Sequence, residues 1–277
     1  MKQVILNNKM YRYTVMENTS TKQVAIFLLG ALQDIESVSK YTEQFSKILT
    51  CITVEIPGTG YAEPLDPTVS IHDQGCILLD FINYMDISSA HIIGFSYATA
   101  IAVELCHIWP GVKSLSICGG VPGIPQSGVA ATKNMIAASM LGKSAFAKSF
   151  IESLTVNRDD IPRQRVIKKA MEKNISQLEE DRIQMFFNNS VRLLVHKPIN
   201  LDKIAIPAVI CAAEHDPYVT TKIAKEFAQQ LPNSHYYEIP KSDHLAHLEQ
   251  PEKVTKALIL LASSAVSIER TLNELTV

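Results

Sequence analysis

Three residues that lie far apart in this sequence, Ser96, Asp216 and His244, are of types that can act together on an acyl bond. A serine hydroxyl attacks a carbonyl carbon effectively only when a base takes its proton during the attack, and histidine is the usual base. A carboxylate hydrogen-bonded to that histidine fixes its tautomer and stabilises the imidazolium that forms. If the fold brings the three side chains together, they predict nucleophilic catalysis on an ester or thioester.

Ser96 lies in a stretch that predicts a strand, a tight turn and a helix. The residues from Ala90 are apolar, those after Ser96 are mostly small, and Gly94 and Ala98 lie two positions before and after the serine. Small neighbours let the strand and the helix approach closely enough to hold the serine in a strained backbone conformation. The turn then presents the hydroxyl beyond the sheet edge, above a helix N-terminus that favours negative charge. An ordinary strand-to-helix turn is the alternative interpretation.

His244 is the favoured base because it lies in the loop after the last predicted strand, at the same sheet edge as Ser96. His247, one helical turn further on, is the main competitor. It falls within the next predicted helix, however, and we interpret it as a surface or supporting residue. The other histidines have no such position, and we interpret them as structural or solvated.

Asp216 is the favoured orienting carboxylate because it follows a predicted strand that ends near Ala212. Glu214 is an alternative. Asp243 is another, although a residue adjacent to the histidine rarely has the required geometry. Asp216 could instead cap the helix that begins near Thr220.

The elements that must position these side chains alternate between strand and helix. We expect a mostly parallel, α/β sheet covered by helices on both faces, with the site beyond the carboxyl ends of its strands. Periodicity predicts strands over residues 10–16 (resembling an edge strand), 24–29, 51–56, 90–93, 112–118, 208–212 and 234–239. It predicts helices over residues 37–48, 70–84, 220–230 and 252–264.

The segment from residue 125 to residue 204 has a different character, because strand-like runs are absent and the sequence is amphipathic and helical. We therefore predict a sheet domain formed by residues 1–124 and 205–277, with an all-helical cap, residues 125–204, inserted into it. Met135 and Met140 of the cap could line a channel for an apolar substrate. Additional packing helices of the main domain are the alternative.

Composition excludes several other classes of protein. The net charge of −2, with scattered Lys and Arg, gives no indication of a nucleic-acid partner. No apolar run approaches the length of a membrane span, and the N-terminus does not resemble a signal peptide. The five cysteines lack paired spacing and indicate buried free thiols, which suits a reducing cytoplasm.

Metal and nucleotide chemistry are not expected either. His244 and His247 have ligand spacing but lack a third partner. Gly58-Thr59-Gly60 lacks the further glycine and the helix of a dinucleotide-binding loop. We therefore expect no cofactor and no metal.

The order Ser, Asp, His along the chain, with the ending Glu249-Gln250-Pro251 after His244, resembles the α/β-hydrolase superfamily across essentially the whole chain. The resemblance implies an oxyanion hole formed by the backbone amides of Tyr97 and of Ala31, the latter in the loop after Leu29. We expect Gly30 and Leu32 of that loop, with the two cap methionines, to contact the substrate. The usual His-Gly pair of this loop is replaced by Leu29-Gly30.

Further motifs are similar to bacterial enzymes that handle 3-hydroxyacyl chains on acyl carrier protein, the rhamnolipid-precursor synthases and the related transacylases. This similarity implies an acyl thioester substrate and an acyl carrier protein as a partner. The motifs are Gly30-Ala31, Pro57-Gly58-Thr59-Gly60, Gly120-Val121-Pro122-Gly123, and the cap residues Ile161-Pro162-Arg163, Asn174 and Gln184-Met185-Phe186-Phe187.

Three functions follow, in order of preference. The first is a serine-dependent acyl hydrolase, an esterase or thioesterase. The second is an acyltransferase that uses the same catalytic residues but an alcohol or thiol acceptor in place of water. The third is a non-catalytic binding module on a hydrolase fold, whose usual sign, a missing catalytic residue, is absent from this sequence.

Overall fold

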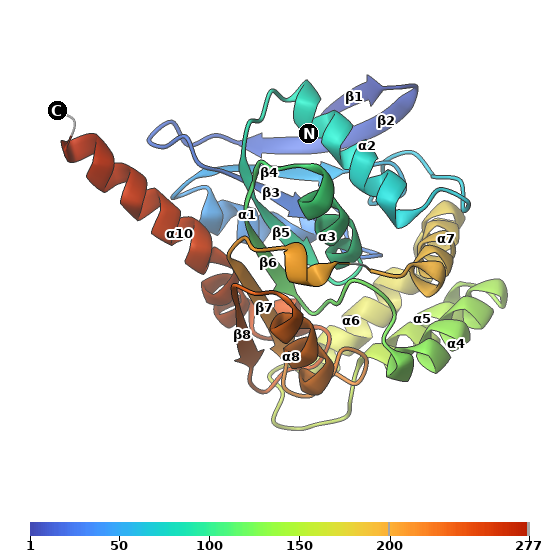
Figure 1. Cartoon of the computed structure of the whole chain (residues 1–277). Coiled ribbons are helices and arrows are strands. Elements are labelled where there is room, and N and C mark those ends of the chain that lie inside the picture. The colour runs from blue at the N-terminus through green and yellow to red at the C-terminus, as the bar shows by residue number, and fades with distance from the viewer. Residues whose placement is uncertain (199, 276–277) are drawn as a thin grey trace.

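A single eight-stranded sheet organises the chain (Figure 1). The computed structural model describes residues 1–198 and 200–275. The strand order is β1-β2-β4-β3-β5-β6-β7-β8, and all pairings are parallel except β1 with β2 and β2 with β4. The strands are β1 (Lys2–Leu6), β2 (Lys9–Met16), β3 (Val24–Leu28), β4 (Thr50–Glu55), β5 (Ala90–Phe95), β6 (Val112–Cys118), β7 (Ala208–Ala213) and β8 (Ser234–Ile239).

Helices cover both faces of this sheet, as the near-continuous apolar strands predict. One apolar core joins α2, α3 and α8 to the sheet, and a second joins α1 and α10 to the opposite face. The helices are α1 (Ser39–Phe45), α2 (Ile71–Tyr84), α3 (Ala98–Ile108), α4 (Val129–Met140), α5 (Lys143–Leu154), α6 (Gln164–Ser176), α7 (Glu180–Val195), α8 (Thr221–Gln230), α9 (Ala246–Glu249) and α10 (Pro251–Leu275), with 3₁₀ turns at Glu36–Val38, Gln126–Gly128 and Leu201–Lys203.

The prediction that residues 10–16 form an edge strand is wrong, because β1 pairs with β2 on its outer side. Asn7 and Asn8 connect the two strands, with φ values of 50° and 59°. Asparagine tolerates this left-handed conformation, and two such residues form the tight turn that suits a hairpin. The Asn-Asn pair was the sequence signal for the additional strand.

The closing helix α10 is longer than predicted and extends away from the sheet (Figure 1). Its distal part is tied to the loop before β3. The Glu269 carboxylate accepts hydrogen bonds from the Thr21 hydroxyl (2.8 Å), the Lys22 amide (2.9 Å) and the Gln23 side chain (2.7 Å). These bonds stabilise a part of the helix that has left the core.

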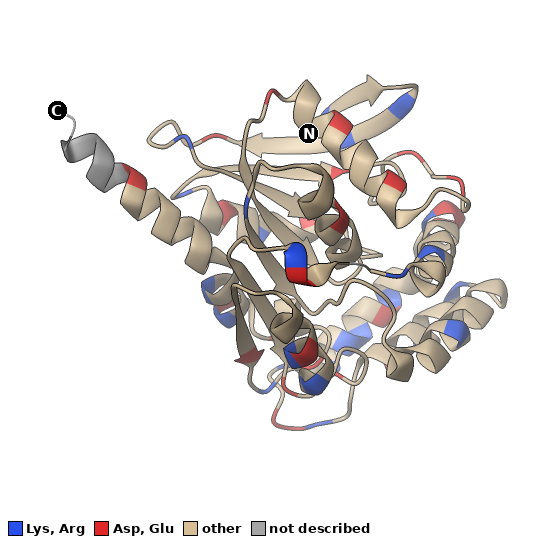
Figure 2. Ribbon diagram, viewed as in Figure 1, with Lys and Arg blue, Asp and Glu red and all other residues tan. Residues whose placement is uncertain are grey.

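Four helices, α4 to α7, lie between β6 and β7, and no strand interrupts them in the described part of this segment. They enclose an apolar core of their own, which includes Phe146, Phe150 and Phe186. We refer to residues 125–204 as the cap. Figure 2 shows charges of both signs on the cap helices, whereas β3, β5 and β7 carry none. No helix within the described residues is long and apolar enough to cross a membrane.

Candidate active site

Ser96 occupies the tight turn between β5 and α3, and its φ of 45° confirms the strained conformation expected there. The Ser96 amide donates to the carbonyl oxygen of Cys118 (2.9 Å), which fixes the turn to the end of β6. Gly94 permits the close approach. A Cβ atom at this position would lie 2.9 Å from Cδ1 of Ile117 and 3.7 Å from the backbone of Ala98.

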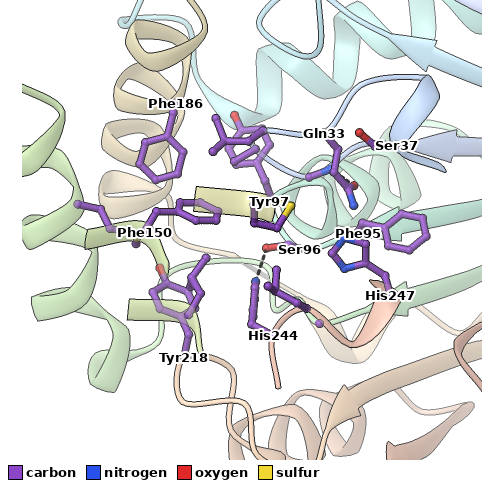
Figure 3. Close-up of a pocket in the computed structure, with 18 of the residues that line it drawn as sticks. Gln33, Ser37, Phe95, Ser96, Tyr97, Phe150, Phe186, Tyr218, His244 and His247 are labelled. Atoms are coloured by element: carbon purple, nitrogen blue, oxygen red, sulfur yellow. Dashed lines mark hydrogen bonds between the residues drawn. The ribbon is translucent and has the colours of Figure 1, made fainter. Parts of the chain in front are cut away.

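The fold brings Ser96, His244 and Asp216 together, as predicted; Figure 3 shows the pair of Ser96 and His244. The Ser96 Oγ atom lies 3.1 Å from Nε2 of His244. The Nδ1 atom of His244 lies 2.7 Å from Oδ2 of Asp216. The three residues come from the loops after β5, β8 and β7, all at the carboxyl edge of the sheet. The arrangement can transfer a proton from the hydroxyl to the imidazole while the carboxylate orients the ring.

The alternative carboxylates have other partners. Oε2 of Glu214 accepts the Lys241 amide (2.8 Å). Asp243 is fully buried, and its hydrogen bonds go to groups other than the histidine ring. Its Oδ1 accepts the Leu245 amide (3.1 Å), and its Oδ2 accepts the side chain of Gln164 at the start of α6 (2.9 Å). Asp243 therefore links the loop of His244 to the cap.

The pKa values of the two histidines near the site, His244 and His247, are shifted in opposite directions. Burial alone would lower the pKa of His244, but the negative charges of Asp216 and Asp243 outweigh it and raise that pKa above its ordinary value. Burial, together with the charge of His244, lowers the pKa of His247 to about 4. His247 is therefore neutral near physiological pH. It is half-buried and lines the cavity beside Phe95, with ring centroids 6.3 Å apart, whereas His244 is the histidine bonded to Ser96.

The loop after β3 folds back on itself next to Ser96. The Gln33 amide donates to the Gly30 carbonyl (3.1 Å), and the Gly30 amide donates to Oε1 of Gln33 (2.8 Å). Within the described residues, neither the Ala31 amide nor the Tyr97 amide donates to another protein group. Both residues line the same cavity, so both amides are free for a ligand oxygen.

A cavity of about 310 Å³ opens above Ser96, between the sheet edge and the cap. In Figure 3 the aromatic side chains of Phe150, Phe186 and Tyr218 lie on one side of Ser96, and Gln33, Ser37 and His247 lie on the other. The first side is therefore mostly apolar, whereas the second carries polar groups beside the ring of Phe95. The apolar lining residues are Ala31, Leu32, Phe95, Ile124, Met135, Phe150, Leu154, Met171, Phe186, Leu193, Leu245 and Leu248.

Of the four residues expected to contact substrate, Gly30, Leu32 and Met135 line this cavity. Met140 does not. It is 77% exposed at the end of α4 and is absent from the cavity wall, so its expected position was wrong. Met135 and Met140 are five residues apart, which places them roughly 140° apart around the helix.

Sequence reasoning missed several residues of the cavity wall. Gln33 and Tyr218 had a signal, since each lies two positions after a predicted site residue, Ala31 and Asp216 respectively. The Tyr218 hydroxyl donates to Oγ1 of Thr132 on α4 (2.7 Å), which joins the loop of Asp216 to the cap. Ser37 and Phe150 had no local signal, because only the packing of the cap and loops directs them inward. No group of three metal-ligating side chains lies together in the described chain.

A mostly parallel, doubly covered sheet with a strained serine turn, a histidine and a carboxylate at its carboxyl edge defines the α/β-hydrolase class. The sequence model of the Alpha/beta hydrolase family matches residues 34–257, and the chain belongs to this family.

Relatives within the family are distant in sequence. The chain is 25% identical to 3-oxoadipate enol-lactonase 1 of Acinetobacter baylyi over 214 residues, which cover 73% of this chain and 74% of that protein. The fold matches the crystal structure of an α/β-hydrolase enzyme from a deep-sea metagenome library with a TM-score of 0.82, at 18% identity and over 94% of this chain and 96% of the other. It also matches a thermophilic esterase from Thermogutta terrifontis with a TM-score of 0.78, at 14% identity and over 99% of both chains. The similarity to carrier-protein acyltransferases stays a prediction.

Proposed function

We propose that this protein is a serine-dependent acyl hydrolase, an esterase or thioesterase that acts on a small substrate with an apolar part. The observation that carries the proposal is the hydrogen-bonded chain from Ser96 Oγ through His244 to Asp216, which opens into an apolar cavity beside two free amides. The names of the esterase and lactonase relatives support ester chemistry for this class of site.

In the first half of the reaction, Ser96 Oγ attacks the substrate carbonyl carbon while Nε2 of His244 takes the hydroxyl proton. The carbonyl oxygen becomes an oxyanion, which accepts hydrogen bonds from the amides of Ala31 and Tyr97. The imidazolium then gives its proton to the leaving alcohol or thiol, and the acyl group stays on Ser96. Asp216 stabilises the imidazolium throughout.

In the second half, a water molecule attacks the acyl-enzyme while His244 takes one of its protons. The proton then returns to Ser96 as the carboxylic acid leaves. The apolar side of the cavity would receive the hydrocarbon part of the substrate, because burying that surface is favourable. The polar side, with Gln33, Ser37 and His247, would receive the part that carries oxygen or nitrogen.

The test is a panel of p-nitrophenyl esters and acyl thioesters of increasing chain length, with the Ser96→Ala variant as control. We expect turnover by the wild type and a loss of about 10⁶-fold in kcat for the variant, the cost typical of a triad nucleophile. Adding alcohol and thiol acceptors separates hydrolysis from transfer. Formation of a new ester or thioester in preference to free acid would identify an acyltransferase. Wild-type turnover no faster than that of Ser96→Ala would contradict the proposal.

A further inference from the structure

A buried arginine of the cap is hydrogen-bonded to the loop that carries Ala31. Arg182 lies in the first turn of α7 and is 3% exposed. Its Nη2 atom donates to the carbonyl oxygens of Leu32 (2.9 Å) and Gln33 (3.3 Å). Leu32 and Gln33 directly follow Ala31 in the chain. The cap therefore hydrogen-bonds the loop next to the amide proposed to bind the oxyanion.

The same loop is closed by a bond of its own at one end and is bonded to the sheet domain at the other. Gln33 closes the turn by accepting the Gly30 amide through Oε1 (2.8 Å). Beyond the turn, the Ile35 amide donates to Oε1 of the buried Glu55 at the end of β4 (2.9 Å). Between these two bonds, the carbonyls of Leu32 and Gln33 have Arg182 as their partner. The seating of α7 therefore fixes the middle of the loop.

Arg182 is itself held in place by a cluster formed by Tyr61, Arg12 and Glu55, which we call the arginine cluster. Its guanidinium lies 4.5 Å from the ring centroid of Tyr61, and the guanidinium of Arg12 lies 5.2 Å from the same centroid. Glu55 fixes both neighbours, since its Oε2 accepts the Tyr61 amide (2.8 Å) and lies 2.9 Å from Nη1 of Arg12. Gly60 makes room for this cluster, because a Cβ atom there would overlap the Glu55 carboxylate. Gly60 of the glycine motif after β4 thus leaves space for the arginine cluster.

The hydrogen bonding of Arg182 is incomplete for a buried cation. Its Nε and Nη1 atoms are buried and have no hydrogen-bond partner within the described residues. Burying a charged group in this way costs free energy, and the burial lowers the pKa of Arg182. If the position served only packing, an apolar side chain would fill it at a lower cost in folding free energy. The contacts with the loop carbonyls and with the face of the Tyr61 ring are the interactions that an apolar side chain would not supply.

We propose that Arg182 is a positioning residue: by holding the carbonyls of Leu32 and Gln33, it aims the Ala31 amide at the oxyanion. The inference rests on the proposed hydrolase function. Donors that are fixed before the reaction stabilise the transition state without reorganisation, so a loose donor lowers kcat rather than substrate binding. The oxyanion hole is then complete only when α7 is seated on the sheet domain, which couples the cap to the chemistry.

The test compares Arg182→Met and Arg182→Lys with a matched control, Asn188→Leu. Asn188 is buried on the same helix and bonds the Leu65 carbonyl (3.4 Å), outside the loop of Ala31. Steady-state kinetics give kcat and KM, and a boronic acid that forms a tetrahedral adduct reports the affinity for a transition-state mimic. Guanidinium ion at millimolar concentration is added to Arg182→Met, and thermal unfolding is measured for every variant.

We expect Arg182→Met to lower kcat by about 10- to 100-fold, with KM nearly unchanged and boronic acid affinity lowered in proportion. Arg182→Lys should recover part of the loss, because an ammonium can donate to the carbonyls without the planar fork of arginine. Guanidinium should restore part of the rate of Arg182→Met. Asn188→Leu should lower the unfolding temperature while leaving kcat and boronic acid affinity near the wild-type values.

Loss of activity in Arg182→Met that matches Asn188→Leu, or a rise in KM alone, would overturn the inference while Ser96-dependent turnover kept the proposed function intact. Lack of Ser96-dependent turnover in the wild type would overturn both.

Discussion

Asp216 uses its two carboxylate oxygens for two different tasks. Oδ2 lies 2.7 Å from Nδ1 of His244, whereas Oδ1 accepts the amides of Tyr218 and Val219, both at 2.8 Å. The Asp216 side chain therefore cannot rotate without breaking its hydrogen bonds to the Tyr218 and Val219 amides. In this way the backbone after β7 sets the orientation of the His244 ring. The alternative interpretation, that Asp216 caps the helix beginning near Thr220, is wrong: Thr220 is the N-cap of α8, and its hydroxyl accepts the Ile223 amide (3.4 Å).

Asp216→Asn should lower kcat by about 10⁴-fold, because the amide no longer holds His244 in the reactive tautomer. KM for a p-nitrophenyl ester should change little. Glu214→Gln is the matched control, since that carboxylate accepts the Lys241 amide and lies 3.6 Å from Nε2 of His215, whereas His244 is bonded by Asp216. Steady-state kinetics of the two variants measure the difference. A normal rate for Asp216→Asn, with a loss for Glu214→Gln, would transfer the orienting role to Glu214.

The acid limb of the profile of kcat/KM against pH should reflect the free enzyme's His244. His244 must be neutral to take the serine proton, so the rate should rise as pH increases through the pKa of His244. Asp216 and Asp243 raise that pKa, so the midpoint should lie above the ordinary histidine value of roughly 6.5.

Asp243→Asn removes one of the two negative charges, and we expect the acid limb to shift to lower pH. The variant leaves the contact between His244 and Asp216 in place. Glu214→Gln should not move the midpoint. An acid limb that moved upward in Asp243→Asn would contradict the assignment of the raised pKa to these charges.

Much of the site was predictable because parallel strands end at one edge. Ser96, Asp216 and His244 each follow a strand, and that position alone brought them together across 148 positions of sequence between Ser96 and His244. The role of Arg182 had no local signal, since its partners are backbone carbonyls 149 and 150 positions away and any residue type could supply them. When two side chains interact, both residue types can be read in the sequence. When a side chain bonds a backbone carbonyl, the residue type of its partner gives no such indication.

The inward face of α4 could not be predicted either. Amphipathicity selects a face only when one side of a helix is clearly polar, and α4 carries alanine and methionine around most of its circumference. Tertiary packing therefore decided that Met135 faces the cavity and Met140 faces solvent.

Met135→Ala and Met140→Ala form a matched pair for the substrate cavity. Met135 is 3% exposed and lines the cavity, so its truncation should shift the preferred ester toward longer acyl chains. Truncating a buried side chain should also lower the free energy of unfolding by about 2–5 kcal/mol. Met140→Ala should change neither property. Chain-length profiles of kcat/KM check this, and equal profiles for the two variants would place the acyl chain elsewhere.

The turn at Ser96 should tolerate no larger residue at Gly94 without a change in Ile117. Gly94→Ala should cost about 1–3 kcal/mol of unfolding free energy, because the new Cβ atom would lie 2.9 Å from Cδ1 of Ile117. Ile117→Val removes that Cδ1 atom, so the double variant should be more stable than the sum of the single changes predicts. Urea unfolding of the four proteins measures the coupling. Strict additivity would show that this contact does not limit residue size.

The most direct measurement is mass spectrometry of the protein after treatment with a fluorophosphonate, which reacts with activated serine hydroxyls. We predict a single adduct, located by peptide mapping on Ser96, that forms at least about 10³-fold more slowly in His244→Ala because the base is lost. An adduct on a different serine, or equally fast labelling of Ser96 in His244→Ala, would contradict the proposal that this histidine activates Ser96.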